Sequence, residues 1–183
     1  MRKEMSSIEN INVIHEHIVR LGRLISAQRD DLPTVGHSID FAHPHIEIQD
    51  DEYNYVMTER GVDIVRKKTR NVGELLMWVF EHVAFSIAVR DMRTIVTDSI
   101  DQRRFIFSRQ LELLNRLNAK WADVVRQKQS EQLRRSPFDD SSLARAKYCG
   151  ELRERGLSDS EAWKSACEKY PLPQHTEPHS GGD

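Results

Sequence analysis

Hydrophobic residues are densest between positions 74 and 89, where the chain reads ELLMWVFEHVAFSIAV. On a helical wheel they spread over every side, and a helix that is apolar all round has to be buried. The run is shorter than the ~20 residues that cross a bilayer. The pattern therefore predicts a core helix, with Asn71 as its N-cap and Glu74 completing a capping-box spacing. We expect it to continue, more polar, to about Thr97.

Apolar residues at spacings of three and four predict helices on both sides of this core helix. The first is expected at 7–28, with Ser6 or Ser7 as its N-cap, and the next two at 101–117 and 118–135, capped by Asp101 and Asn118. Two shorter helices are predicted at 143–155 and 158–170. The later of these starts with a capping box and uses Trp163, Ala166 and Tyr170 as its apolar side, so the pair forms a helical hairpin.

The period changes to two after an irregular stretch at 29–44. Ile46 and Ile48 fall on one side of a predicted strand, and His45, Glu47 and Gln49 fall on the other, which faces water. Residues 50–52 form a turn, 53–59 a second strand, and 62–69 a third. The sequence therefore predicts an α+β fold that is predominantly α-helical, with a buried central helix, surrounding helices and a small antiparallel β-meander.

The chain of 183 residues has the length of one ordinary domain. We expect one domain at 1–138, a C-terminal helical hairpin at 139–170 packed on it, and a tail at 171–183. The tail, PLPQHTEPHSGGD, holds too few apolar groups to pack and is expected to be disordered.

Charge is nearly balanced overall but unevenly distributed. Lys and Arg number 27 against 29 Asp and Glu, so the net charge favours neither nucleic acid nor a membrane surface. Residues 31–59 hold seven acidic residues and no Lys or Arg, whereas residues 60–70 hold five basic residues and one Asp. The acidic block consists of Asp31, Asp40, Glu47, Asp50, Asp51, Glu52 and Glu59.

The first ten residues are followed by no uninterrupted apolar region, so they do not read as a signal peptide, and we expect a cytoplasmic protein. Cys149 and Cys167 are then expected to stay as thiols. We predict no metal and no cofactor, because no Cys/His cluster has the spacing of a zinc site.

Two alternative functions rest on particular side chains. A small metal-dependent hydrolase would use Asp40, His43, His45 and Glu81. Against it, histidines near position 40, His37 among them, commonly bond to loop backbone, and Glu81 is expected to form an ion pair with Arg103 or Arg104. A nucleic-acid-binding regulator would use Arg103, Arg104, Arg109 and Arg116, although interleaved carboxylates favour an ordinary solvated face.

Several stretches together resemble the bacterial polymorphic-toxin immunity protein family numbered 63. They read LPTVGHSIDFAHPHIEI, YNYVMTERG, ELLMWVFEHVAFSIA and QRRFIFSRQLELLNRL, followed by a tryptophan. The resemblance covers about residues 8–138 and leaves out the predicted C-terminal hairpin. The fitting positions are Pro33, Thr34, Gly36, Asp40, Pro44, His45, Glu47, Glu59, Arg60, Gly61, Leu75, Trp78, Phe80, Glu81, Phe85, Ala88, Gln110, Leu111 and Trp121.

The resemblance implies a non-enzymatic cytoplasmic inhibitor that binds a cognate toxin domain, encoded by a neighbouring gene, and neutralises it by stoichiometric occlusion. Toxin domains that attack nucleic acids carry basic clefts, which an acidic surface complements. We therefore expect toxin contact at part of the acidic block. The same carboxylates could instead simply keep a sheet edge soluble. The expected toxin-binding residues are Asp40, Glu47, Asp50, Asp51 and Glu52.

Overall fold

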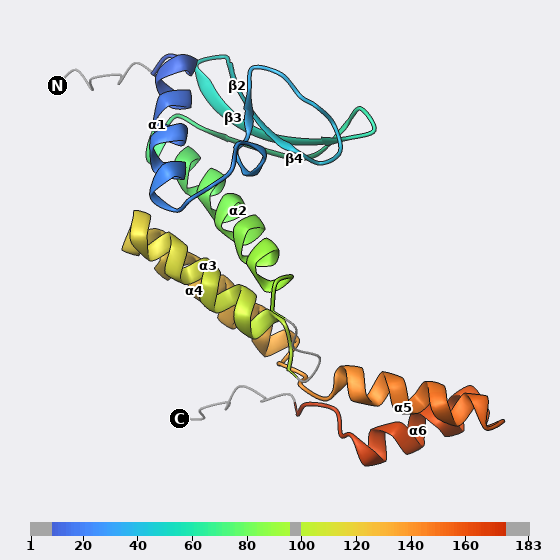
Figure 1. Ribbon diagram of the computed structural model, residues 1–183. Coiled ribbons are helices and arrows are strands. Elements are labelled where there is room, and N and C mark those ends of the chain that lie inside the picture. The colour runs from blue at the N-terminus through green and yellow to red at the C-terminus, as the bar shows by residue number, and fades with distance from the viewer. Residues whose placement is uncertain (1–8, 96–99, 175–183) are drawn as a thin grey trace, which may run out of the picture. The chain divides into compact units, whose positions relative to one another are not determined.

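The computed structural model describes residues 9–95 and 100–174. Its elements confirm a predominantly helical α+β fold with a small sheet (Figure 1). In chain order they are α1 (Ile11–Leu24), a 3-10 turn (Arg29–Asp31), β1 (Thr34–Val35), β2 (Pro44–Gln49), β3 (Glu52–Glu59), β4 (Val62–Thr69), α2 (Val72–Met92), α3 (Arg103–Leu117), α4 (Ala119–Arg135), α5 (Ser142–Glu154) and α6 (Asp159–Lys169).

The chain divides into two compact units. Unit 1 consists of Met1–Ile87 and Gln110–Ala122, and unit 2 of Ala88–Arg109 and Asp123–Asp183. Helices α2, α3 and α4 each contribute residues to both units. The domain boundaries expected from the sequence stay a prediction, and most of the expected disordered tail, residues 175–183, lies outside the described residues.

The sheet belongs to unit 1 and has the strand order β1-β2-β3-β4. Both the β2–β3 and β3–β4 pairs are antiparallel, which confirms the predicted meander. The sequence missed β1, which pairs in parallel with β2 through Thr34↔His45 and Val35↔Ile46 and makes the sheet mixed. A strand of two residues is too short to show a period.

Two tight turns join the meander. Asp50 and Asp51 have φ values of 54° and 55°, and Arg60 and Gly61 have 53° and 76°. Left-handed backbone at both central residues is typical of a type I′ hairpin turn, which matches the twist of the strands. The register of β3 against β4 shifts between Met57 and Thr58.

Helix α1 is shorter than the predicted 7–28. It begins at Ile11 because Asn10 is its N-cap, whose side chain accepts a hydrogen bond from the Asn12 backbone N–H at 2.9 Å. Ser6 and Ser7, the caps expected from the sequence, lie outside the described residues. The buried stripe follows the predicted spacing, with Ile14 and Ile18 in the core.

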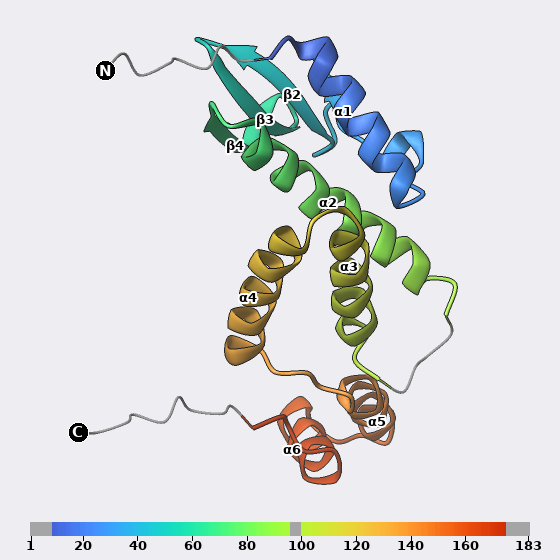
Figure 2. The ribbon, with the colours of Figure 1, turned by 90° about the vertical axis from the view of Figure 1, so that its left-hand side faces the viewer.

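The first part of helix α2 runs beside α1 and the sheet (Figures 1 and 2). Its buried residues supply much of the core of unit 1, together with residues of α1 and the sheet. Asn71 accepts a hydrogen bond from the Glu74 backbone N–H at 3.2 Å, as its predicted role as cap requires. The helix ends at Met92, earlier than expected. Phe85 is 42% exposed, so the helix is not buried on every side. Its buried residues include Leu75, Val79, Phe80, Val83, Ala84, Ile87 and Ala88.

By length and composition alone, α2 is also able to cross a membrane, because its 21 residues exceed the apolar run seen in the sequence. The core helix of a soluble protein passes the same test. The burial of residues on several sides of α2 agrees with a core helix.

The described residues of unit 2 form two small apolar clusters. One forms around Ala88, Ile106 and Phe107. The other forms inside the predicted α5–α6 hairpin, where Cys149 and Leu152 pack with Ala162 and Ala166. Trp163 is 48% exposed, so the apolar side of α6 is turned from the predicted one.

The start of α6 and the end of α5 have the capping residues predicted from the sequence. The capping box of Ser158 and Glu161 is present, and Gly156, with φ at 93°, follows α5 as its stop. Cys149 and Cys167 are both free thiols, as expected.

Candidate functional site

The five expected toxin-binding residues do not form one patch. Asp50 and Asp51 are exposed in the β2–β3 turn, and Glu52 begins β3 directly after them. Asp40 lies in the loop before β2, where its Oδ1 accepts a hydrogen bond from the Gly61 N–H at 3.4 Å. Gly61 belongs to the β3–β4 turn, at the opposite end of the meander from the β2–β3 turn.

Glu47 is engaged within the sheet. Its Oε1 lies 2.9 Å from His45 Nε2, and its Oε2 lies 3.3 Å from Arg66 Nη1. Burial alone would raise the pKa of Glu47, but the hydrogen bonds from His45 and Arg66 outweigh it and lower the pKa. His45 is 3% exposed, so its expected place on a water-facing side is wrong. Glu47 is thus a hydrogen-bond partner of a buried histidine.

Arg66 of β4 joins this pair to further groups on the same side of the sheet. Its Nε donates to Asp63 Oδ2 at 2.8 Å, and its Nη1 donates to the side-chain oxygen of the fully buried Asn54 at 3.2 Å. The hydrogen bond from Arg66 is the largest cause of the lowered pKa of Asp63. This face of the sheet is therefore a network of charges that neutralise one another, which the sequence did not reveal.

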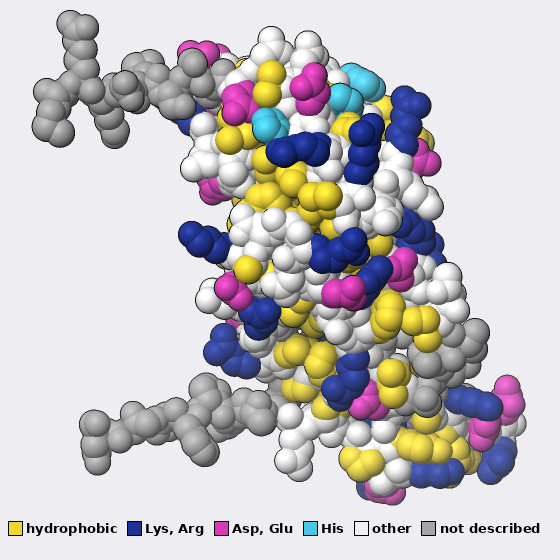
Figure 3. Space-filling view, turned by 60° about the vertical axis from the view of Figure 1, so that its left-hand side comes forward, with side chains coloured by type: hydrophobic (Ala, Val, Ile, Leu, Met, Phe, Trp, Pro, Cys, Tyr) yellow, Lys and Arg dark blue, Asp and Glu magenta, His cyan; other side chains and the backbone are white. Residues whose placement is uncertain are grey.

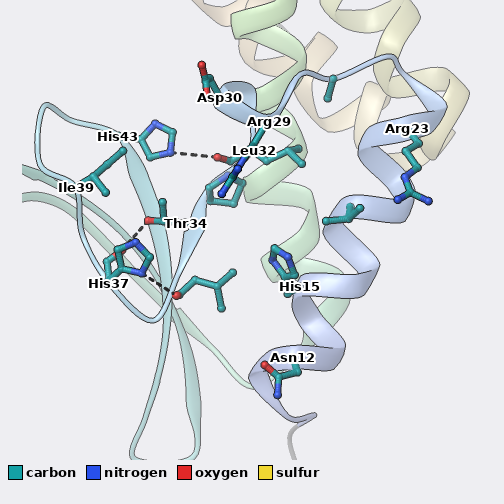
Figure 4. A pocket seen from close by; sticks show the side chains of 14 residues that line it. Asn12, His15, Arg23, Arg29, Asp30, Leu32, Thr34, His37, Ile39 and His43 are labelled. Carbon is teal, nitrogen blue, oxygen red and sulfur yellow. Dashed lines mark hydrogen bonds between the residues drawn. The ribbon is translucent and has the colours of Figure 1, made fainter.

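A groove with a volume of about 1050 Å³ opens between α1 and the segment around β1 (Figure 4). His15 and Arg23 come from α1, while His37, Ile39 and His43 come from the opposite wall. The full lining is Asn12, His15, Val19, Arg23, Ala27, Arg29, Asp30, Leu32, Pro33, Thr34, Val35, His37, Ile39 and His43.

Two of the histidines that line this groove bond to loop backbone, as the sequence favoured. His43 Nε2 lies 3.1 Å from the Leu32 carbonyl oxygen, and His37 Nδ1 lies 3.2 Å from that of Val35. Burial lowers the pKa of His82, and the nearby His43 lowers it further. Within residues 9–95 and 100–174, no three His, Cys, Asp or Glu side chains are grouped so that they could hold a metal ion.

The hydrolase alternative required four groups to meet, and they have separate partners. Asp40 bonds to Gly61, His43 to Leu32 and His45 to Glu47. Glu81 lies near Tyr55, whose pKa is raised by burial and further by the Glu81 charge. Arg103 and Arg104 form ion pairs with Asp101 and Asp140, and the expected ion pair of either arginine with Glu81 stays a prediction.

The nucleic-acid alternative relied on four arginines, and all four have acceptors inside the protein. Figure 3 shows Lys and Arg side chains interspersed with carboxylates over the visible face rather than gathered in one patch. Phosphate contacts would need these guanidinium groups to be available. The pairs are Arg103 with Asp101, Arg104 with Asp140, Arg109 with Asp91, and Arg116 with the Leu24 carbonyl oxygen.

Strand β4 carries exposed apolar side chains that were not predicted from the sequence. Val62 and Ile64 are 64% and 54% exposed, and nearly every residue of the strand is exposed. Phe41, in the loop before β2, is 88% exposed. The run of positive charge at 60–70 was the available signal, since an edge strand often carries Lys and Arg.

Comparison with known protein families gives a match to part of the chain. A family model described as Immunity protein 63 matches residues 49–131, a range that contains β3, β4, α2, α3 and most of α4. No curated protein matches the chain, and no solved structure does. Part of the resemblance, from Pro33 to Glu47, lies before the matched range. Residues 49–131 are therefore similar to the immunity protein 63 family, and the match confirms the resemblance drawn from the sequence over that range.

Proposed function

We propose that this chain is a cytoplasmic immunity protein that binds the toxin domain encoded by a neighbouring gene and neutralises it by stoichiometric occlusion. The match to the Immunity protein 63 family over residues 49–131 carries the proposal, because that family implies a toxin as the partner. In this proposal the protein has no chemistry of its own. It acts by covering the surface through which the toxin reaches its substrate.

The β2–β3 turn is the best placed part of the expected acidic surface. Asp50 and Asp51 are exposed, and neither forms an ion pair with another described residue. Glu52 lies 3.8 Å from Arg70, while Asp40 and Glu47 already serve internal contacts. Exposed carboxylates that form no ion pair within the protein steer a basic partner toward the surface that carries them.

The variant Asp50→Asn with Asp51→Asn tests this surface. Asn tolerates left-handed backbone as Asp does, so the turn keeps its shape while two charges disappear. We expect association with the toxin domain to slow by about threefold or more at low salt, with little change at high salt. Stopped-flow association rates across a salt series measure this.

The matched control removes two exposed carboxylates from the α5–α6 hairpin, Glu154→Gln with Glu168→Gln. It changes net charge equally and should leave the association rate within about twofold of the wild type. Equal slowing by both pairs would show that only net charge matters and would reject the turn as the contact. A wild-type protein that neither binds the toxin domain nor protects cells from it would refute the immunity function.

A further inference from the structure

Strand β4 is an edge of the sheet. The strand order ends with β4, and β3 is the strand that pairs with it among the described residues (Figure 2). In an antiparallel pair, residues that exchange hydrogen bonds with the neighbour alternate with residues whose N–H and C=O groups point away from it. An edge strand therefore offers a row of main-chain donors and acceptors to an incoming strand.

Natural edges are usually protected against such pairing by bulges and by lysines, which repel a like-charged strand but attract an acidic one. The register shift between Met57 and Thr58 affects only the first part of β4. From Val65 to Thr69 the strand pairs with β3 in uninterrupted register. This leaves a regular five-residue edge, about the length of an ordinary strand.

The side chains along β4 divide into two groups. At the start of the strand, Val62 and Ile64 are exposed apolar residues. Toward its end, Lys67 and Lys68 are exposed, and Arg70 follows with a side chain 65% exposed. Lys67 lies over the Trp78 ring with Nζ 5.5 Å from its centroid, which holds its charge close to the strand.

We propose that β4 is a docking edge to which the toxin domain adds an extended segment. The segment would place acidic residues against Lys67, Lys68 and Arg70, and apolar residues against Val62 and Ile64. Charge complementarity favours such a segment over a second copy of β4, which holds three cations and one carboxylate and would bring like charges together. The identity of the partner rests on the proposed function.

The neighbouring β2–β3 turn strengthens this assignment because it has the opposite sign. A partner that meets the negative turn with basic groups and β4 with acidic groups can bind in one orientation only. Main-chain hydrogen bonds give affinity in strand addition, and the flanking side chains give specificity.

Hydrogen exchange of the backbone amides tests strand addition directly. In the complex with the toxin domain, the outward amides of residues 62–70 should exchange at least about tenfold more slowly than in the free protein. Strand β3, paired on both sides already, serves as the internal control and should change little. Unchanged exchange in β4 within a formed complex would overturn the docking edge and leave the immunity function standing.

Charge reversal gives a second measurement. Lys68→Glu with Arg70→Glu should weaken toxin binding by about tenfold or more, while Arg134→Glu with Lys147→Glu, exposed cations of α4 and α5, should leave it within about twofold. Equal effects of the two pairs would count against the acidic partner segment. A wild-type protein that fails to bind the toxin domain at all would remove both the function and the docking edge.

Discussion

Arg66 shows how a single side chain decides what the acidic block can do. Its guanidinium contacts Glu47, Asp63 and Asn54, so two carboxylates and one buried amide depend on it. In sequence, Glu47 belongs to an acidic run without any positive charge, whereas in the fold it lies beside a cation 19 positions away. Among the five expected toxin-binding residues, the carboxylates left to attract a partner are therefore those at the β2–β3 turn.

We expect Arg66→Met to lower the free energy of unfolding by about 1 kcal/mol, because Glu47 and Asn54 lose a donor while the half-exposed ion pairs contribute little. Lys68→Met, two residues along β4, should change stability by less than about 0.5 kcal/mol. Urea denaturation of both variants measures the difference. An Arg66 variant as stable as the wild type would show that the network adds no stability.

At the scale of elements, a cluster in unit 2 ties the start of α3 to the loop between α4 and α5. Asp101 caps α3 by accepting from the Arg103 N–H at 2.9 Å, and its Oδ2 accepts from the Asp139 N–H at 2.9 Å. Arg103 in turn donates to the Ser136 and Pro137 carbonyl oxygens. The hydrogen bond from Arg103 is the main cause that lowers the pKa of Asp101 to about 2.

The lowered pKa of Asp101 makes the free energy of unfolding depend on pH. The folded-state pKa lies below the ordinary value of 3.8, so the stabilisation is complete above pH 4 and is lost as the pH falls through about 2. We expect Asp101→Asn to lower stability at pH 7 by about 1–2 kcal/mol and to flatten its decline between pH 4 and pH 2. Denaturation across that pH range measures both effects. A decline as steep in the variant as in the wild type would assign the acid sensitivity to other groups.

The regular elements could be predicted because their signals are local. Caps at Asn71, Asp101 and Asn118 mark three helices, and alternation marks the strands of the meander. Burial of His45 could not be predicted, because alternation tells which residues share a face and not what covers it. The five expected toxin-binding residues do not form one site, because residues that are close in sequence lie a strand's length apart in the fold.

At the scale of the molecule, the two units share three helices. Each of α2, α3 and α4 is an unbroken helix with residues in both units. Helix formation is cooperative, so the residues along one helix stabilise one another. Unfolding either unit would shorten all three helices and destabilise the parts that remain in the other unit.

We therefore expect a single calorimetric transition. Arg66→Met in unit 1 and Asp101→Asn in unit 2 should each move that transition as a whole, by a few degrees for about 1 kcal/mol in a chain of this size. Two resolved transitions, with each variant shifting only one, would show that the units unfold independently.

The edge strand has a consequence for how such a protein can diversify. Its main-chain donors and acceptors survive every substitution except proline, so outward side chains on β4 can be exchanged without removing the edge. A lineage can then follow a changing partner by altering charge and size along one strand, while the helices behind it keep their sequence.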